Sequence, residues 1–438
     1  MTDANNYRPI STLSPFSKIL ERLVYDQLIS FINKNNILYK YQFGFRKGFS
    51  TEHAILELTD YLRNAIDNKQ YTCGIFLDFS KAFDTVNHSI LLNKLEKYGI
   101  RGLPLQWFYS YLSDRAQFVQ INNTKSDKLM MKCGIPQGST LGPLLFLIYI
   151  NDLANSSDIL KFRIFADDTN IFYSSKNLDE LQNVINNELS KVYTYCIANK
   201  LSINFTKTNY MIITTAQRKD AQINIANITQ KNCIKYLGVY IDKHLNWKSH
   251  LSYISNKIAK NIGILFKIRR YLSLKMLTSF YYSLIFPYIN YGIMSWGAIY
   301  KTSITKLSSQ LRKCVRCIFF LNRHSDPSPY FKLLGILQIE NIYKLRVVLF
   351  THQILNKSMT SYGIFSDSIV PITAVHHYNT RFASSNNLYR HQIRTNYGKF
   401  TYKYTSSKVW ETVPYSFKCL PYTSLKRMYK EYLINNNQ

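Results

Sequence analysis

The sequence predicts an α+β protein built on a ferredoxin-like antiparallel sheet with helices packed on one face. Strand-like and helix-like segments follow one another in the order strand, helix, hairpin, helix, strand, which is typical of that unit. Two of the strand-like runs are joined by a few turn-forming residues, which favours a mixed α+β sheet over a purely parallel one. Of the 438 residues, 46% are hydrophobic, enough for a sizeable core and more than disordered chains contain.

The elements follow from apolar periodicity and from capping and turn residues. The first helix is expected after Ser14, with an early proline that suits a first helical turn. Beyond residue 243 the pattern is mostly helical to about residue 350, and then becomes polar, asparagine-rich and less periodic. The expected helices cover residues 14–32, 52–68, 80–98, 141–153 and 178–198; the expected strands cover 71–77, 159–165, 171–173, 202–214 and 235–242, with a loop over 43–51 and a strand plus tight turn over 130–140.

The charge of the chain is large and unevenly distributed. The 55 basic and 26 acidic residues give a net charge of +29. Residues 1–242 contain 27 basic and 21 acidic residues, whereas residues 243–438 contain 28 basic and only 5 acidic ones. Solubility alone would not concentrate the charge in one half, so we expect a polyanionic partner, most simply a nucleic acid. The 35 tyrosines add possible stacking surfaces, although an AT-rich coding sequence also enriches tyrosine, asparagine and lysine.

No segment predicts export or a membrane span. Residues 279–297 carry no charge over nearly a spanning length, but they include Pro287 and many tyrosines, so we expect buried helices broken at that proline. The seven cysteines form no paired framework, which favours a reduced protein in the cytoplasm or nucleus. Cys314 and Cys317 lack further close ligands and are interpreted as one face of a helix rather than a zinc site.

The segment FADDTNIF places Asp167 and Asp168 side by side between apolar runs. Such a pair is either an exposed turn, where short acidic side chains bond to nearby amides, or a cation site that offsets the repulsion between the carboxylates. A hairpin would carry both to its tip, and the predicted sheet would bring Asp78 close. We expect Asp78 and Asp167 to form the principal pair with Asp168 beside it, because side chains alternate along a strand. Carboxylate oxygens suit Mg²⁺, and two such ions can clamp a phosphoryl displacement.

At this point the motifs resemble those of a known family, the reverse transcriptases of non-LTR (LINE-type) retrotransposons of the jockey/CR1-like group. The resemblance covers nearly the whole chain, and the specific signal is that all the motifs occur in the family's order. The motifs are residues 6–24 (NYRPISTLSPFSKILERLV), 42–55 (QFGFRKGFSTEHAI), 76–88 (FLDFSKAFDTVNH), 134–146 (GIPQGSTLGPLLF), 165–168 (FADD), 201–211 (LSINFTKTNYM) and 236–242 (YLGVYID).

The resemblance implies an RNA-directed DNA polymerase that copies an RNA template onto a DNA primer from dNTPs with two Mg²⁺ ions. It implies Asp78, Asp167 and Asp168 as metal ligands, and Lys207 as the group that protonates or holds the leaving pyrophosphate. Phe83 would be a steric gate against the 2′-hydroxyl, or else an ordinary core residue. The implied nucleotide-binding residues are Arg46, Lys47, Phe79, Phe83, Gln137 and Gly138.

Other residues in these motifs have structural interpretations. His88 is expected to bond to nearby backbone, and Asp84 to act at a helix end rather than as a fourth metal ligand. Trp410, in the C-terminal region, is either a packing anchor or a stacking platform. Arg46 and Lys47 are alternatively ordinary surface charges.

The resemblance further implies a right-hand polymerase with fingers, an antiparallel palm sheet and a helical thumb. We expect fingers and palm in residues 1–242, a helical thumb-like region in 243–350, and a basic C-terminal tail region in 351–438. The thumb would track the template–primer duplex through its backbone, since a polymerase must accept any sequence.

Three functions are consistent with these motifs. The first is an active RNA-directed DNA polymerase. The second is an inactive, truncated retroelement relic that binds nucleic acid without catalysis, because the chain begins just before the first fingers motif and leaves no room for the nuclease that such elements carry. The third, a maturase of the group II intron type, would require a downstream zinc nuclease, which the cysteine and histidine spacing does not support. Without the nuclease, we do not expect target-primed integration by this chain alone.

Overall fold

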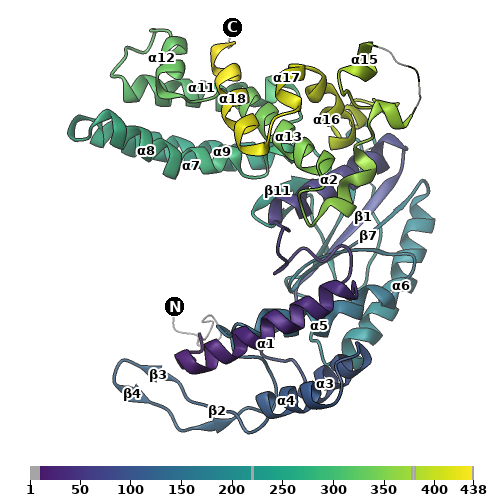
Figure 1. The fold of residues 1–438 in the computed structure, drawn as a ribbon. Helices are drawn as coiled ribbons and strands as arrows, with labels where there is room; N and C mark the ends of the chain where they lie inside the picture. Colours follow the sequence, from purple (N-terminus) through teal and green to yellow (C-terminus); the bar gives the residue numbers. More distant parts are fainter. Residues whose placement is uncertain (1–9, 219–220, 376–377, 379–380, 437–438) are drawn as a thin grey trace.

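A computed structural model describes residues 10–218, 221–375, 378 and 381–436 (Figure 1). The first part of the chain contains helices α1 (Pro15–Lys34), α2 (Thr51–Asp67), α3 (His88–Lys97), α4 (Leu103–Leu112), α5 (Gly142–Ile150) and α6 (Leu178–Ala198). Its strands are β1 (Tyr71–Leu77), β2 (Ala116–Gln117), β3 (Gln120–Ile121), β4 (Thr124–Lys125), β5 (Leu129–Met130), β6 (Lys161–Phe165), β7 (Asp168–Ser175), β8 (Asn209–Ile213), β9 (Thr229–Gln230), β10 (Cys233–Tyr236) and β11 (Val239–Asp242).

The rest of the chain is helical. Its longer helices are α7 (Lys248–Ile268), α8 (Leu274–Leu284), α11 (Lys301–Ile318), α12 (Ser328–Leu334), α13 (Ile339–Leu355), α16 (Tyr402–Glu411) and α18 (Tyr422–Asn435). Shorter ones are α9 (Phe286–Asn290), α10 (Ile293–Trp296), α14 (Tyr362–Phe365), α15 (Arg381–Ser384) and α17 (Tyr415–Lys418). In Figure 1, α7 and α8 form one arm, α1 and the β2–β5 ribbon form a second arm, and the sheet joins the two.

The central sheet has the predicted ferredoxin-like order. Its five strands lie in the order β6-β7-β1-β8-β9. Neighbours among the first four are antiparallel, and β9 adds a short parallel edge. In chain order β1 is followed by helices, then by the β6–β7 hairpin, then by α6 and β8. The α+β fold class is therefore confirmed, and α6 packs across β1 and β7 as one of the covering helices.

Several predicted elements are wrong in extent. The helix expected over residues 80–98 begins only at His88, after Asn87 caps it by accepting a hydrogen bond from the Ile90 N–H. Residues 80–86 instead form turns that bond to distant segments, because the Ser80 N–H reaches the Ser202 carbonyl. The strand expected over residues 202–214 is shorter and consists of β8 alone. The strand expected to begin at residue 130 is also shorter, and only the two residues of β5 form a strand.

The strand expected over residues 235–242 is a hairpin of β10 and β11. The chain turns at Leu237 and Gly238, both of which adopt positive φ. Glycine adopts positive φ easily, so Gly238 indicates a turn. The apolar residues on both sides of it favour a continuous strand, and the turn was therefore not predicted. The Tyr291 hydroxyl donates a hydrogen bond to the Leu237 carbonyl at 2.5 Å, which holds this turn against the helical region.

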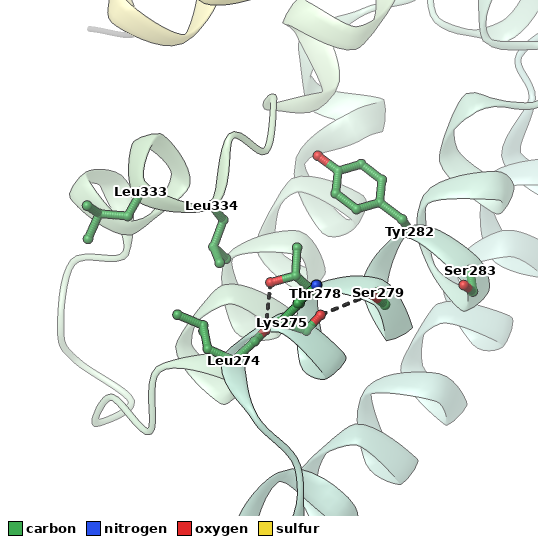
Figure 2. Close-up of a pocket in the computed structure, with 8 residues that line it drawn as sticks. All are labelled: Leu274, Lys275, Thr278, Ser279, Tyr282, Ser283, Leu333 and Leu334. Atoms are coloured by element: carbon green, nitrogen blue, oxygen red, sulfur yellow. Dashed lines mark hydrogen bonds between the residues drawn. The ribbon is translucent and has the colours of Figure 1, made fainter.

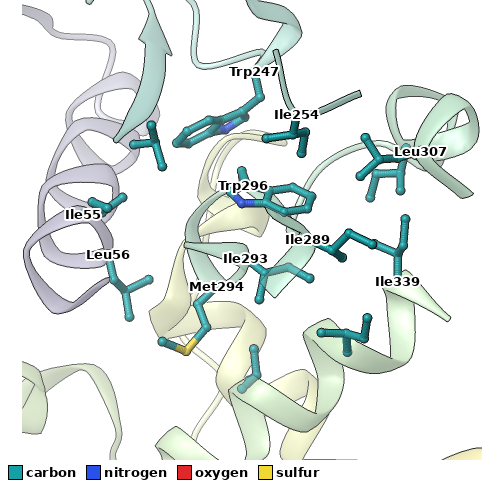
Figure 3. Packing of buried hydrophobic residues seen from close by; sticks show 14 of the residues in the cluster. Ile55, Leu56, Trp247, Ile254, Ile289, Ile293, Met294, Trp296, Leu307 and Ile339 are labelled. Atoms are coloured by element: carbon teal, nitrogen blue, oxygen red, sulfur yellow. The ribbon is translucent and has the colours of Figure 1, made fainter. Parts of the chain in front are cut away.

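The helical region and the C-terminal region share one hydrophobic core with α2. Figure 3 shows Ile55 and Leu56 of α2 facing Trp296 of α10, with α7, α11 and α13 around them. The same core extends to Leu433 in α18. The polar and less periodic sequence beyond residue 350 still forms helices, and α16 and α18 pack closely on α13. The proposed boundaries at 242/243 and 350/351 do not separate independent cores.

Polar contacts on α2 fix the same junction. Arg63 is buried and donates to the carbonyls of Ser295 and Phe400, each at 2.6 Å. Asp60 accepts the Tyr402 N–H at 2.8 Å, and burial raises the pKa of this carboxyl to about 7. Asp67 accepts the N–H and the hydroxyl of Thr395, both at 2.7 Å. The C-terminal region is therefore held on α2 by directed bonds as well as by apolar packing.

Other expectations about this half are confirmed. The uncharged stretch from 279 to 297 is broken into α8, α9 and α10, with Pro287 in the first turn of α9. Cys314 and Cys317 are buried on one helix, α11. Trp410 is a packing anchor, buried with its indole N–H donated to the Asn386 carbonyl. Among the described residues, no helix is both long and apolar enough to cross a bilayer.

Candidate active site

Two of the predicted carboxylates meet at the ends of β1 and β7. The antiparallel register of these strands ends with Leu77 opposite Thr169, so the next pair along is Asp78 and Asp168. Residues directly opposite each other in an antiparallel pair have their side chains on the same face. Alternation places Phe76 and Asn170 on that face as well. The register therefore brings one carboxylate from each strand to the same edge of the sheet.

The register places Asp168, and not Asp167, opposite Asp78, and the role of Asp167 as the principal partner stays a prediction. Residues Ala166 and Asp167 form the two-residue turn between β6 and β7, because Phe165 pairs with Asp168. Ala166 has a φ of +57°, as the first central residue of a type II′ turn does. Asp168 is thus the first residue of β7 and faces Asp78, whereas Asp167 lies in the turn and is half-buried.

The two carboxylates line a cavity of about 250 Å³. Lys207 lines it too, as does Asn209, which pairs with Phe76 across the β1–β8 ladder. Further lining comes from the β10–β11 hairpin, including Lys235 and Tyr236. Three of the predicted residues, Asp78, Asp168 and Lys207, therefore share one hollow although they come from three strands or their ends.

The oxygen atoms at this cavity are of the chemical type that binds a hard divalent cation. Asp78 and Asp168 provide carboxylate oxygens, and the buried side-chain oxygen of Asn209 has no hydrogen-bond partner in the structure. Such oxygens are the ligands that Mg²⁺ prefers. Within the described part of the chain, however, no three His, Cys, Asp or Glu side chains come close enough to form a complete metal cluster. The cavity thus supplies part of a cation site, with room for ligands from a substrate.

The loop over residues 42–50, called the fingers loop from here on, lies directly against the Asp-Asp turn, which the sequence did not reveal. Gln42 is buried, and its side-chain oxygen accepts the Gly44 N–H at 2.9 Å and the Ala166 N–H at 3.1 Å. The Phe43 N–H donates to the Ile164 carbonyl at 2.8 Å. Gln42 lay inside a predicted motif, but nothing in the sequence indicated which backbone group its amide would meet.

The two basic residues of this loop differ in environment. Arg46 is half-buried, donates to the carbonyls of Tyr39 and Gln42, and lies 4.1 Å from the centroid of the Phe49 ring. Burial lowers the pKa of its guanidinium. Lys47 is exposed. Arg46 thus braces the loop, and only Lys47 extends fully into solvent as the prediction for a triphosphate contact requires.

The two phenylalanines of the β1 end are both packed, but to different degrees. Phe79 is 7% exposed and belongs to the core, and its backbone forms an antiparallel bridge with Ile203. Phe83 is half-buried and stacks on Phe146 of α5 with 4.3 Å between ring centroids. Phe45 of the fingers loop meets its edge at 6.4 Å. Phe83 therefore keeps one side accessible between the fingers loop and α5.

The Pro136-Gln137-Gly138 turn is fixed by its neighbours. The Gln137 side-chain amide donates to Asp84 Oδ1 at 2.8 Å, and the Gln137 carbonyl accepts the Ser11 N–H at 2.7 Å. Gly138 has a φ of +114°, and a Cβ there would lie 2.9 Å from the Ser11 carbonyl oxygen. Only glycine fits this approach. Asp84 thus holds Gln137 instead of acting at a helix end, which corrects the expectation for that residue.

Two further residues support this turn. His88 Nε2 bonds to the Gly134 carbonyl at 2.8 Å, so its expected structural role is confirmed. Glu21 of α1 is 2% exposed and accepts the Tyr111 hydroxyl at 2.8 Å and the Thr140 N–H at 2.6 Å. Sequence reasoning missed Glu21, because a glutamate in an amphipathic helix normally faces solvent.

A wider hollow lies elsewhere in the described structure. Figure 2 shows it between α8 and α12, where Leu274, Tyr282 and Leu334 surround a volume of about 710 Å³. It contains hydroxyls and one lysine but no carboxylate. It lacks the groups that phosphoryl transfer needs, so the smaller cavity at Asp78 and Asp168 is the better candidate for an active site.

Comparison with known proteins agrees with this architecture. A family model for reverse transcriptase (RNA-dependent DNA polymerase) matches residues 2–241, more than half of the chain. In Drosophila melanogaster, the probable RNA-directed DNA polymerase from transposon BS is 31% identical over 72% of this chain and 36% of its own length. The probable RNA-directed DNA polymerase from transposon X-element is 30% identical over 72% of this chain and 35% of its own length. The RNA-directed DNA polymerase from mobile element jockey is 28% identical over 72% of this chain and 36% of its own length.

This chain spans little more than a third of the length of these relatives. Among solved structures, apo telomerase from Candida tropicalis is 14% identical over 74% of this chain and 55% of that one, with a TM-score of 0.41, a likeness too low to add to the assignment. The family model and the relatives confirm the resemblance to jockey-like non-LTR elements. The chain belongs to the reverse transcriptase family.

Proposed function

We propose that this chain is an RNA-directed DNA polymerase that extends a DNA primer along an RNA template with dNTPs. The observation that carries the proposal is the meeting of Asp78 and Asp168 at one edge of the palm sheet, in a cavity that also contains Lys207. Family membership supports the same reaction. We also propose fingers and palm over residues 1–242, a thumb over 243–350 and a basic C-terminal region over 351–438.

In this proposal Asp78 and Asp168 hold the cation, with Asp167 as the adjacent carboxylate of the turn. Two bound Mg²⁺ ions would supply charge neutralisation and a clamp for the in-line displacement at the α-phosphate. Lys207 is exposed beside the carboxylates, so its ammonium group can offset charge on the leaving pyrophosphate or give it a proton. Asp78, Asp168 and Lys207 line the cavity, and Asp167 lies in the adjoining turn.

The substrate would be positioned by the residues around the cavity. Gln137, fixed by Asp84 and Ser11, would contact the incoming nucleotide, and Gly138 would allow a close backbone approach. Phe83 would lie under the sugar, and Lys47 would meet the triphosphate from the fingers loop.

The seven cysteines are all unbridged, which suits a reducing compartment such as the cytoplasm or nucleus.

Primer extension tests the proposal. The protein is incubated with a primed RNA template, dNTPs and Mg²⁺, and the extended DNA is measured. We expect Asp78→Asn, Asp167→Asn and Asp168→Asn each to lower the rate by roughly 100-fold or more, since removing one group that stabilises transition-state charge costs that much. Asp158→Asn, an exposed aspartate that does not line the cavity, serves as the matched control and should extend normally.

The outcomes separate the proposal from its alternative. Extension by the parent protein that survives Asp168→Asn would remove this carboxylate from the mechanism. Absence of product from the parent protein, together with retained salt-sensitive RNA binding, would favour a relic that binds nucleic acid without catalysis.

A further inference from the structure

The turn that carries Asp167 has an unfavourable backbone conformation. Ala166 precedes it with a φ of +57°, which residues with a Cβ rarely adopt and which glycine normally provides at this turn position. Ala166 is also buried, at 4% exposure. Backbone strain of this kind persists only where the surroundings hold it. The structure must therefore contain groups that keep the turn in this geometry.

Gln42 is such a group. It is 2% exposed, and its Oε1 accepts the Ala166 N–H at 3.1 Å and the Gly44 N–H at 2.9 Å. One side-chain oxygen thus bonds the turn between β6 and β7 to the fingers loop. Without that oxygen the buried Ala166 N–H would lose its acceptor, and an unsatisfied buried donor is unfavourable.

The backbone around Gln42 is fixed on β6. The Phe43 N–H donates to the Ile164 carbonyl at 2.8 Å, and the Ile164 N–H donates to the Tyr41 carbonyl at 3.0 Å. These two bonds form a parallel bridge between Gln42 and Ile164. The glutamine is therefore anchored by its neighbours, so its side chain can impose a position on the turn.

Gly44 completes the contact. A Cβ on Gly44 would lie 2.4 Å from the Ala166 nitrogen and 3.0 Å from the Phe165 carbonyl carbon. Any larger residue would push the fingers loop away from the turn, because backbone atoms cannot move aside as a flexible side chain does. The fingers loop and the Asp-Asp turn thus meet backbone to backbone, with the Gln42 amide between them.

We propose that Gln42 is a positioning residue for the polymerase reaction: it holds the strained turn at Ala166 and thereby sets where Asp167 and Asp168 present their carboxylates to the cation. The proposal rests on the proposed function, because it assigns Gln42 to the same site. It also makes the fingers loop a support of the catalytic hairpin, in addition to any contact that the loop makes with substrate.

The first test is amide hydrogen exchange, which does not depend on activity. Gln42→Met keeps the length of the side chain but removes the acceptor oxygen, whereas Gln42→Glu keeps an acceptor oxygen at the same place. We expect exchange in peptides covering residues 163–169 to be several-fold faster in Gln42→Met and close to the parent rate in Gln42→Glu. Unchanged exchange in Gln42→Met would overturn the proposal.

The second test is primer extension with the same variants. We expect Gln42→Met to lower kcat roughly 10- to 100-fold, because small displacements of catalytic groups have effects of that size, while KM for dNTP changes little. The Mg²⁺ concentration for half-maximal rate should rise. Gln42→Glu should recover most of kcat. Faster exchange with an unchanged kcat and Mg²⁺ dependence would reduce Gln42 to a purely structural role and overturn the inference.

The matched control is Gln182→Met. Gln182 on α6 also accepts a backbone N–H through Oε1, that of Asn224 at 2.7 Å, but it lies outside the cavity. Its variant should leave exchange at 163–169 and kcat unchanged. Gly44→Ala should reproduce the effects of Gln42→Met. If the parent protein extends no primer, the proposed function fails, and the exchange measurement still decides whether Gln42 holds the turn.

Discussion

At the scale of single residues, the site depends on which of two adjacent aspartates begins a strand. Asp168 pairs with Phe165 and continues the β1–β7 register, so it meets Asp78. Asp167 is left in the turn. The prediction of Asp78 and Asp167 as the principal pair rested on the alternation of side chains along a strand, which leaves the register open. The role of Arg46 was likewise not readable from the sequence. Its guanidinium donates hydrogen bonds to the backbone carbonyls of Tyr39 and Gln42.

Phe83→Ala tests the sugar gate. If the ring lies under the nucleotide sugar, its removal should allow ribonucleotides to be incorporated, and the ratio of kcat/KM for dNTP over rNTP should fall. Because Phe83 stacks on Phe146 and is half-buried, we also expect a loss of roughly 2–4 kcal/mol in the free energy of unfolding. Primer extension with each nucleotide type and denaturant unfolding measure the two effects.

The control for that variant is Phe319→Ala. Phe319 is similarly half-buried and packs against Tyr330 with 4.6 Å between ring centroids, far from the carboxylates. It should lower stability without altering sugar selection. Equal sugar selection in Phe83→Ala and the parent protein would reject the gate and leave Phe83 as a packing residue.

At the scale of elements, the connection from β11 to α7 joins the proposed palm to the proposed thumb. Asp242 ends β11, is 8% exposed, and accepts three backbone N–H groups, from His244 at 3.1 Å, Asn246 at 3.0 Å and Trp247 at 2.6 Å. Trp247 then adopts a left-handed conformation just before α7 begins. One carboxylate therefore determines the direction in which the long thumb helix leaves the sheet.

Asp242→Ala removes all three bonds. We expect the free energy of unfolding to fall by roughly 2–4 kcal/mol, since hydrogen bonds to a charged acceptor contribute more than neutral ones. The thumb should also be less firmly oriented, so extension products should become shorter at equal enzyme concentration. Asp326→Ala is the comparison, because Asp326 accepts bonds only from Ser328 on an exposed loop. Equal stability and product length in both variants would contradict this role.

At the scale of the whole molecule, the basic residues 243–438 pack against the rest of the protein. The C-terminal region packs on α13 and on the fingers helix α2, and Arg346 forms an ion pair with Glu52 of α2. The excess positive charge of residues 243–438 therefore has a fixed arrangement, part of it along exposed positions of α7 such as Lys260 and Lys267. A fixed array of this kind suits binding to a nucleic-acid backbone.

RNA binding should be strongly salt-dependent and should depend on that half. We expect the double variant Lys260→Gln and Lys267→Gln to bind RNA more weakly and to reduce the slope of log K against log salt by roughly 1–2, about one unit for each lost phosphate contact. Lys34→Gln with Lys97→Gln removes the same charge from the other half and should change the slope less. Equal slopes in the two double variants would place the RNA contact elsewhere.

Much of the fold was predictable from sequence because it depends on local patterns. Apolar periodicity predicted a helix over residues 178–198, which are the bounds of α6, and short apolar runs located β1, β6 and β7. Residues 80–86 form turns and not a helix. Besides local bonds to the Lys81 carbonyl, they bond to segments more than 45 residues away, at Ser202 and Ile135, which no local pattern reveals. The β10–β11 hairpin was missed because its turn lies inside a continuous apolar run.

The sequence by itself determined the α+β class, the family, the concentration of positive charge and the identity of the acidic residues, since these depend on composition, order and motif. Only the tertiary structure decided that Asp168 faces Asp78, that Gln42 and Glu21 hold the two turns, and that the C-terminal region packs on the fingers. The physical reason is that each of these depends on strand register or on a hydrogen bond between distant segments, and both are set when the chain packs, not by neighbouring residues.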